Sequence, residues 1–283
     1  MKKILKWSTI AFVVLLSLAL LASVVLYSIG MEKLTRSYPN IPVETVSIPT
    51  DSGAVARGQH IATIWACTNC HGANLGGTLI THDPIEGTFP ILGTIPAPNL
   101  TSGKGGIAKS YNESDWVRAI RHGVKPNGRV EIFMYDYSAM SDRDLGDLIA
   151  YLKQIPPADS DYPAPSYGPI LPIVPAFGIF TPVAEQIDQN APRQADPVPG
   201  ATKEYGKYLS ALCAQCHGTN LVAPLRGKWK QEDFVRAVQT GVLPNGRQIG
   251  PAMPSSIYGE MNDTELAALW LYLQNLPAAQ SQR

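Results

Sequence analysis

The sequence contains the pattern Cys-x-x-Cys-His twice, at residues 67–71 and 213–217, and these two copies use all four cysteines of the chain. Two thiols separated by two residues can each add to a vinyl group of one haem, and the histidine that follows can bind the haem iron. A zinc site or a redox disulfide would explain the cysteine pairs, but neither explains a histidine after both. The pattern therefore predicts two covalently bound haem c groups. The cysteines predicted to form the thioether bonds are Cys67, Cys70, Cys213 and Cys216, and the predicted proximal iron ligands are His71 and His217.

The first 30 residues combine a basic start with a long uncharged run. Lys2, Lys3 and Lys6 precede residues 8–29, which contain no charged side chain and, at 22 residues, are long enough to cross a bilayer as one helix. A cleaved signal peptide would have a shorter apolar core and a small-residue cleavage site, which residues 20–22 fit poorly. We therefore expect residues 1–30 to be an uncleaved, single-pass transmembrane signal-anchor in the bacterial cytoplasmic membrane. The lysines would be cytoplasmic and the haem domains periplasmic.

Two further segments are rich in proline. Residues 31–53 show no helical period and are expected to form an extended tether, which holds the first domain away from the membrane or lies against a partner. Residues 158–200 include an uncharged stretch from 162 to 184, whose six prolines exclude a regular membrane-spanning helix. We expect this second segment to be a linker that packs against the domains or a partner subunit.

A helix and the turn after it occur twice in the chain. Residues 116–129 (WVRAIRHGVKPNGR) recur as residues 234–247 (FVRAVQTGVLPNGR), which indicates an internal duplication. The duplication predicts a first domain at residues 54–157 and a second at residues 201–280, and Ser114 is the expected N-cap of the first copy of the helix. The two repeats are offset by 146 residues at the cysteines but by 118 at this helix, so the first repeat carries a loop that is 28 residues longer.

A haem bound by one histidine needs a second axial ligand or keeps an open face, and this choice separates electron carriers from enzymes. Each repeat has a methionine between its Asn-Gly-Arg turn and its last helix, and these two residues, Met134 and Met253, are the candidate distal iron ligands. Met140 and Met261 are rival donors. Because each directly precedes a helix start, each also fits the role of an apolar residue that packs at the helix N-terminus.

Other polar residues have less specific patterns. His60, His82 and His122 are expected to have surface or supporting roles, although His82 lies in the long loop of the first repeat, from which it can approach the first haem. Arginine side chains on the repeated helix either pair with haem propionates or line an exposed helix face. These arginines are Arg118, Arg121 and Arg236.

These motifs resemble those of the class I cytochrome c family, specifically membrane-anchored di-haem members with two tandem domains. The resemblance runs from about residue 55 to 277 and rests on both Cys-x-x-Cys-His motifs, on Pro-Asn-Leu-Thr at 98–101, on the repeated helix and on Met-Ser-Asp at 140–142. It implies an all-α fold in which the N-terminal transmembrane helix is followed by two cytochrome c domains joined by the Pro-rich linker. It also implies His/Met ligation, one-electron transfer, and crossing first and last helices in each domain. The expected glycine–aromatic contacts at these crossings are Gly58 with Tyr151 and Gly206 with Tyr272.

The sequence therefore predicts a protein that carries single electrons between membrane or soluble redox proteins, which act as donor and acceptor. The formal net charge is zero, which gives no support for nucleic-acid binding. Two alternatives stay open: a di-haem enzyme similar to peroxidases or thiosulfate dehydrogenases, and a cytochrome subunit of an oxidase or dehydrogenase complex. Only the enzyme needs a haem with an open face.

Overall fold

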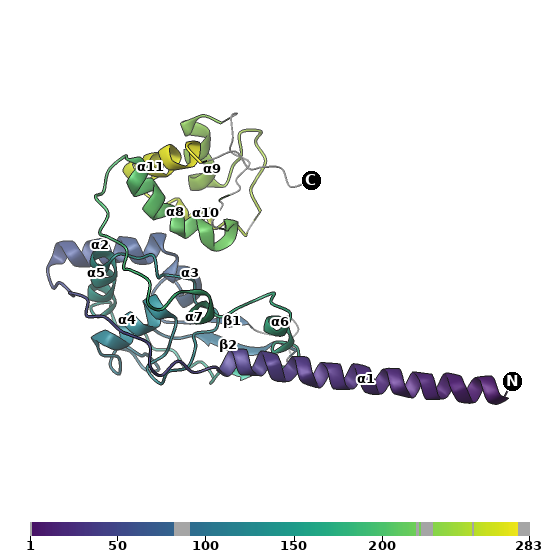
Figure 1. Cartoon of the computed structure of the whole chain (residues 1–283). Helices are drawn as coiled ribbons and strands as arrows, with labels where there is room; N and C mark the ends of the chain where they lie inside the picture. The colour runs from purple at the N-terminus through teal and green to yellow at the C-terminus, as the bar shows by residue number, and fades with distance from the viewer. Residues whose placement is uncertain (1, 82–90, 219–220, 222–228, 251, 277–283) are drawn as a thin grey trace.

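The computed structural model describes residues 2–81, 91–218, 221, 229–250 and 252–276 (Figure 1). Helix α1 (Lys2–Thr35) projects from the rest of the molecule. Among the described residues it is the one helix long and apolar enough to cross a membrane, with a mean hydropathy of 2.8 in its most apolar window. The helix continues beyond the expected boundary at residue 30, and an ion pair between Glu32 and Arg36 (2.6 Å) stabilises its last turn.

The segment after α1 is extended, as expected, but it lies along the first domain. The backbone N–H of Tyr38 donates a hydrogen bond to the carbonyl of Gly128 (2.7 Å). Glu44 forms an ion pair with Arg121 and accepts a hydrogen bond from Nε2 of His122 (3.0 Å). The segment therefore packs against the first domain, because its carboxylate and its backbone find partners on the domain itself.

The first domain is built around two crossing helices. Its helices are α2 (Ser52–Ile64), α3 (Cys67–His71), α4 (Glu113–His122) and α5 (Asp142–Leu152). Helices α2 and α5 meet at Gly58, where a Cβ atom would overlap the carbonyl of Asp147 and lie 2.8 Å from the Cβ of Tyr151. This close approach confirms the expected contact of Gly58 with Tyr151.

Helix α4 begins earlier than the sequence analysis expected. Its N-cap is Asn112, whose side chain accepts a hydrogen bond from the N–H of Asp115, while the Asp115 side chain accepts one from the N–H of Asn112. Ser114 therefore lies inside the first turn and is not the cap. The reciprocal pair satisfies two backbone donors, whereas a serine cap alone satisfies one.

The second domain repeats this plan with α8 (Lys203–His217), α9 (Gln231–Thr240), α10 (Ser255–Tyr258) and α11 (Asp263–Gln274). Helices α8 and α11 cross at Gly206, where a Cβ atom would overlap the carbonyl of Ala268 and lie 2.9 Å from the Cβ of Tyr272. The expected contact of Gly206 with Tyr272 is confirmed. In this domain the first helix runs without interruption through the Cys-x-x-Cys-His motif.

A small sheet corrects the expectation of an all-α fold. Strands β1 (Thr78–Thr81), β2 (Gly93–Ala97) and β3 (Ser166–Tyr167) form an antiparallel sheet in the order β1-β2-β3. Strands β1 and β2 come from the longer loop of the first repeat, and β3 comes from the Pro-rich linker. The loop is rich in threonine and isoleucine, which favour strands, and the corresponding loop of the second repeat is 28 residues shorter.

The linker between the domains packs against both the first domain and α1. It contains β3 and two helices of one turn each, α6 (Ile173–Ala176) and α7 (Val183–Gln186). Helix α6 lies beside the C-terminal part of α1 (Figure 1). Neither helix has the length to cross a membrane, in agreement with the effect expected of the prolines.

The crossing in the second domain gives a first prediction. Gly206→Ala is expected to lower the free energy of unfolding by about 1–3 kcal/mol, because the new methyl group would push α8 and α11 apart. Gly250→Ala is the matched control, since no atom lies within 4 Å of a Cβ at that position. Its effect is expected to stay within about 0.5 kcal/mol. Urea unfolding of the haem-loaded proteins measures both, and equal stability of the two variants would contradict the prediction.

The segment after α1 gives a second prediction. Burial alone would raise the pKa of Glu44, but hydrogen bonds from Arg121 and His122 lower it to about 2 from 4.5. The ionised carboxylate therefore stabilises the fold above about pH 4.5, and this stability is lost as the pH falls toward 2. Glu44→Gln is expected to cost at most about 3 kcal/mol at pH 7, and the cost should shrink below pH 4.5 in urea unfolding.

The control for this second prediction is Glu113→Gln. Glu113 forms an ion pair with Lys153 (3.1 Å), but its side chain is 62% exposed. An exposed pair contributes at most about 1 kcal/mol. A cost for Glu44→Gln that is no larger than this at pH 7 would show that the contact with Arg121 and His122 does not hold the segment in place.

Candidate haem sites

The first motif occupies one helical turn at the end of α2. The chain leaves α2 through Ala66, which adopts the left-handed conformation (φ 60°), and enters α3 at Cys67. Cys67 and His71 are buried, and Cys70 is partly buried. The structure therefore brings both thiols and the imidazole of this motif together on one short helix.

The orientation of His71 is fixed by a backbone carbonyl. Nδ1 of His71 lies 2.8 Å from the carbonyl oxygen of Pro98. Because a carbonyl only accepts, Nδ1 carries the proton and Nε2 keeps its lone pair. Burial lowers the pKa of His71, although the hydrogen bond to Pro98 raises it. The imidazole is thus held neutral and in the tautomer that binds a metal through Nε2.

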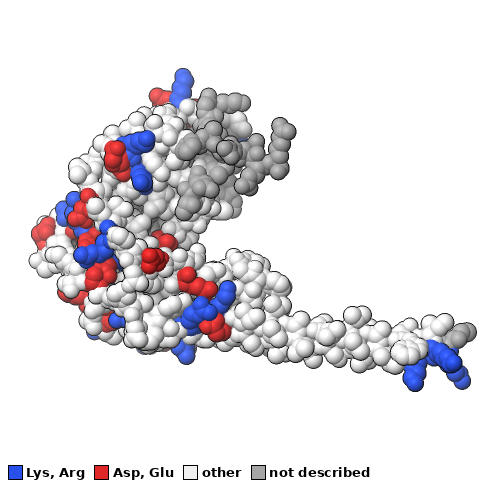
Figure 2. Space-filling model, in the orientation of Figure 1, with Lys and Arg blue, Asp and Glu red and all other residues white. Residues whose placement is uncertain are grey.

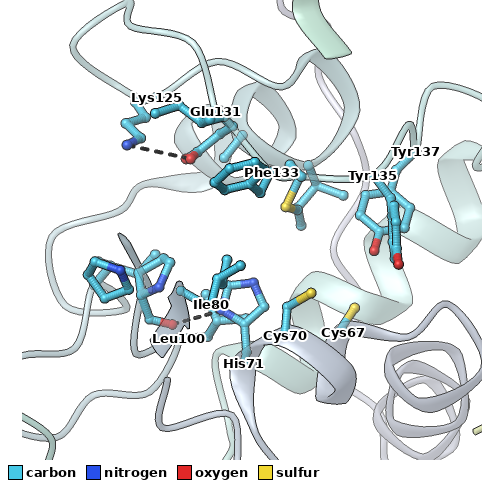
Figure 3. Close-up of a pocket in the computed structure, with 18 of the residues that line it drawn as sticks. Cys67, Cys70, His71, Ile80, Leu100, Lys125, Glu131, Phe133, Tyr135 and Tyr137 are labelled. Carbon is cyan, nitrogen blue, oxygen red and sulfur yellow. Dashed lines mark hydrogen bonds and ion pairs between the residues drawn. The ribbon is translucent and has the colours of Figure 1, made fainter. Parts of the chain in front are cut away.

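A largely apolar cavity of about 300 Å³ lies beside this motif. Figure 3 shows Cys67, Cys70 and His71 on one wall, together with Ile80 and Leu100, while Glu131 and Phe133 lie on the opposite wall and Tyr135 and Tyr137 close one end. The walls come from α3, from the sheet and from the loop that follows Val130.

One buried donor in this cavity has no protein partner among the described residues. Trp116 lines the cavity and is 2% exposed, but its indole Nε1–H makes no hydrogen bond. A buried N–H without a partner is costly and uncommon. An apolar ring system with acceptor groups, bound next to two thiols and an imidazole, would satisfy both the apolar walls and this donor. A covalently attached haem therefore fits the residues present.

Two methionines border the same cavity. Met134, on the loop opposite α3, is partly buried, and Met140 is fully buried in the core. The N–H of Met140 donates to the carbonyl of Tyr137 (2.9 Å), and its carbonyl accepts from Arg121 (2.9 Å). The backbone of Met140 is thus fixed on both sides, directly before the N-cap Ser141 of α5.

Sequence analysis missed a charged pair on the cavity wall. Nζ of Lys125 lies 3.6 Å from Oε2 of Glu131, and both residues line the cavity (Figure 3). Burial raises the pKa of Glu131, and Lys125 opposes this effect. The only sequence signal for this pair was that its two residues flank the repeated Asn-Gly-Arg turn.

The second motif has a different environment. Cys213 is partly buried, whereas Cys216 and His217 are exposed at the end of α8. Burial raises the pKa of Tyr258 on α10, and the charges of ionised Cys213 and Cys216 raise it further. Met253 is partly buried in the loop before α10, and Met261 is buried before α11. Residues 219, 220 and 222–228, which follow the motif, lie outside the described part of the chain.

The other histidines have protein partners or lie outside the description. Nε2 of His60 donates to Glu265 of the second domain (2.8 Å), and this hydrogen bond raises the pKa of His60. Nε2 of His122 donates to Glu44 (3.0 Å), and the other ring nitrogen bonds the side chain of Gln189 (2.7 Å). Both agree with the supporting roles expected. His82 lies outside the described residues.

The arginines of the repeated helix do not turn to the cavity. Arg121 binds Glu44 and Asp142 (2.9 Å for the latter pair), and it is buried, so it lies neither on the cavity wall nor on an exposed helix face. Arg236 pairs with Asp233 (3.1 Å) on an exposed helix face. Arg118 does not line the cavity, and its Nε is buried without a hydrogen-bond partner among the described residues.

Comparison with protein families settles which group binds here. Residues 55–156 match the family model described as cytochrome c, and residues 201–273 match the model described as cytochrome c oxidase, cbb3-type, subunit III. Each match covers one Cys-x-x-Cys-His motif and its crossing helices. The chain is a di-haem member of the cytochrome c family. The two haems of this cytochrome are covalently bound.

Several known proteins are similar to this cytochrome. The fructose dehydrogenase cytochrome subunit of Gluconobacter japonicus is 24% identical over 277 residues, which cover 84% of this chain and 55% of the relative. The gluconate 2-dehydrogenase cytochrome c subunit of Pantoea cypripedii is 31% identical over 178 residues, covering 58% and 37%. A diheme cytochrome c-type protein of Cereibacter sphaeroides is 24% identical over 274 residues, covering 80% and 87%. This cytochrome thus spans about half or less of the two dehydrogenase subunits.

Proposed function

We propose that this cytochrome relays single electrons from a dehydrogenase to a further redox protein on the outer face of the bacterial cytoplasmic membrane, where α1 is its uncleaved, single-pass anchor. The support for a dehydrogenase partner is that two of its relatives are named cytochrome subunits of dehydrogenases. When bound, each haem iron takes up and releases one electron. The protein supplies burial, ligands and a fixed distance between the two sites.

The proposed ligand sets follow from the positions of the motif residues. His71 borders the cavity, and its Nε2 carries no proton because Nδ1 donates to Pro98. Met134 comes from the loop on the opposite wall. The fixed backbone of Met140 favours a packing role for its side chain. The thioether residues proposed are Cys67, Cys70, Cys213 and Cys216, with His71 and Met134 at the first iron and His217 and Met253 at the second.

The observation that carries the relay is a contact between the two haem sites. Gln215 lies between the two cysteines of the second motif, and its side chain pairs with the backbone of Asp136 in the first domain. Nε2 of Gln215 donates to the Asp136 carbonyl (2.7 Å), and the Asp136 N–H donates to Oε1 of Gln215 (3.0 Å). Tyr135 and Tyr137, on either side of Asp136, both line the first cavity. The second motif thus touches the loop that closes the first haem site.

Aromatic side chains strengthen the same contact. The ring of Trp65, two residues before the first motif, packs 5.8 Å from Tyr137 and 5.9 Å from Tyr208 of α8. The hydroxyl of Tyr208 donates to Asp144 (2.7 Å) and accepts from the N–H of Ser141 (3.2 Å). Packed aromatic rings therefore join the residues before the first motif to α8, which carries the second motif. Two hydrogen bonds also join α8 to the start of α5.

Tyr135 connects the surroundings of the two motifs. It lines the cavity together with Cys70, and it precedes Asp136, which bonds Gln215 of the second motif. The cysteines are the points at which the haem edges join the protein, so this loop is close to an attachment point of the first cofactor and contacts the motif that holds the second. This arrangement supports rapid transfer within one chain.

Gln215→Ala tests the relay. The variant loses two hydrogen bonds of about 1 kcal/mol each, which weakens the contact at this point by roughly thirtyfold. We expect slower electron equilibration between the haems after flash photoreduction, and faster hydrogen exchange at the Asp136 amide. Asn69→Ala is the matched control, because Asn69 holds the same place in the first motif and is exposed. An unchanged rate in Gln215→Ala would contradict the proposed route.

Met134→Leu tests the distal ligand of the first haem. The leucine keeps the apolar wall but removes the sulfur, so one haem should bind carbon monoxide and its reduction potential should fall, because a thioether favours the ferrous state. Met140→Leu is the control and should leave both properties unchanged. The reverse result, with loss of ligation only in Met140→Leu, would move the ligand to Met140.

A second function is favoured by one observation in the first cavity. Glu131 is a carboxyl whose pKa is raised by burial, and it faces the wall that carries Cys70 and His71 (Figure 3). Such a group suits proton transfer in a di-haem enzyme similar to peroxidases or thiosulfate dehydrogenases. Turnover with peroxide or thiosulfate that is lost in Glu131→Gln would favour the enzyme. No turnover in the unmodified protein would favour the relay.

A further inference from the structure

We propose that residues 170–180 of the linker form a second membrane contact, at the boundary between lipid and water beside α1. This inference rests on the proposal that α1 is a membrane anchor. Three apolar side chains of the segment face solvent, with exposures of 46% for Ile170, 63% for Phe177 and 76% for Ile179. No residue between 162 and 184 carries a charge. Grouped apolar side chains of this size normally mark a surface that something covers.

The position of the segment indicates that lipid covers its exposed apolar side chains. The backbone of Gly30 in α1 lies so close to Pro172 that a Cβ atom would overlap the Pro172 carbonyl, and Leu34 of α1 packs against Leu171. Gly30 directly follows the uncharged run at residues 8–29. At 1.5 Å per residue this run is about 33 Å long, which matches the hydrocarbon core of a bilayer. The segment therefore lies at the height where α1 leaves the lipid.

Charged residues lie on the water side of the height at which α1 leaves the lipid. Glu185 of α7 pairs with Lys33 (3.8 Å) and with Arg36 (3.1 Å), both beyond Gly30 in the chain. Figure 2 shows an uncharged lobe beside the projecting helix, whereas blue and red side chains gather where the helix joins the body and on the body itself. The uncharged surface of the segment is thus continuous with that of α1.

The backbone of the segment suits a poorly hydrated place. Its prolines at 172 and 175 have no N–H to satisfy. The N–H groups of Ile173, Val174, Phe177 and Gly178 donate to carbonyls of the segment itself, at 2.9–3.3 Å. Because these donors need no water, the segment can enter the interface at low cost while it buries its apolar side chains.

The contact would also set the height of the first haem site. Leu34 and Leu171 belong to one buried cluster with Ile95 and Ile132, and the last two line the first cavity. A continuous apolar path therefore joins the membrane-facing segment to the wall of that cavity. Two points of attachment, α1 and the segment, would restrict tilting of the first domain on the membrane.

Lipid photolabelling of the full-length, haem-loaded protein tests this proposal. The protein is placed in nanodiscs of phosphatidylcholine and phosphatidylglycerol that contain a lipid with a diazirine in its acyl chain, and labelled peptides are mapped by mass spectrometry. We expect label in α1 and in the peptide with Phe177 and Ile179. The peptide with Val198 should stay unlabelled. Val198 is the internal control, since it is an apolar linker residue with 82% exposure.

The outcomes separate this proposal from the proposed anchor. Label in α1 alone overturns the second contact but supports the anchor, and label in neither peptide overturns both. Label in the segment alone supports the lipid contact and overturns the anchor. If crosslinking in native membranes instead joins the segment to a second copy or to another protein, and no lipid label is found, a protein covers this surface and the proposal is overturned.

A double variant sharpens the test. Phe177→Asp with Ile179→Asp should lose the label in the segment and keep it in α1, because two charges oppose entry into the interface. Val198→Asp should change neither. Phe177→Ser with Ile179→Ser is a milder pair, and the haem absorption spectrum shows whether each variant is folded. Label that persists in the segment of folded double variants would overturn the proposal.

Discussion

Each domain depends on a close approach between its first and last helices. At Gly58 and at Gly206 the backbone of one helix touches the backbone of the other, with no room for a Cβ atom. The Cys-x-x-Cys-His motif directly follows that first helix in the first domain and ends it in the second, so the crossing determines where the thiols and the imidazole face. A larger residue at either glycine would move the whole haem-binding turn as well as cost packing energy.

The sequence predicted those parts that local patterns determine. The spacing of cysteine and histidine predicted both sites, the duplicated helix predicted two domains, and the resemblance to class I cytochromes implied the crossings at the two glycines. Contacts between distant segments were not predictable in this way. The carbonyl of Pro98 that orients His71 lies 27 residues from it, and Glu44 lies 77 residues from Arg121. Both depend on backbone or side-chain groups that any extended segment offers, so no local signal marks them.

The two Pro-rich segments are structural parts of the first domain. Glu44 of the first segment and Gln189 of the linker bind the same side chain, that of His122 on α4. Proline limits the conformations available to both segments before folding, so less conformational entropy is lost when they pack against the domain. The absence of a helical period in residues 31–53 indicated extended chain, which begins only after Thr35, but it carried no information on where that chain would lie.

The longer loop of the first repeat explains why the two haem sites differ. It supplies β1 and β2, and Ile80 and Ile95 from these strands line the first cavity. Ile95 also packs with Leu34 of α1 and Leu171 beside α6. The insertion therefore encloses the first site and attaches it to the proposed membrane anchor at the same time. The second repeat has no such loop, and its Cys216 and His217 are exposed. In the proposed relay the first site is therefore the one nearer the membrane anchor, and the second, held to it by Gln215, is the more exposed of the two.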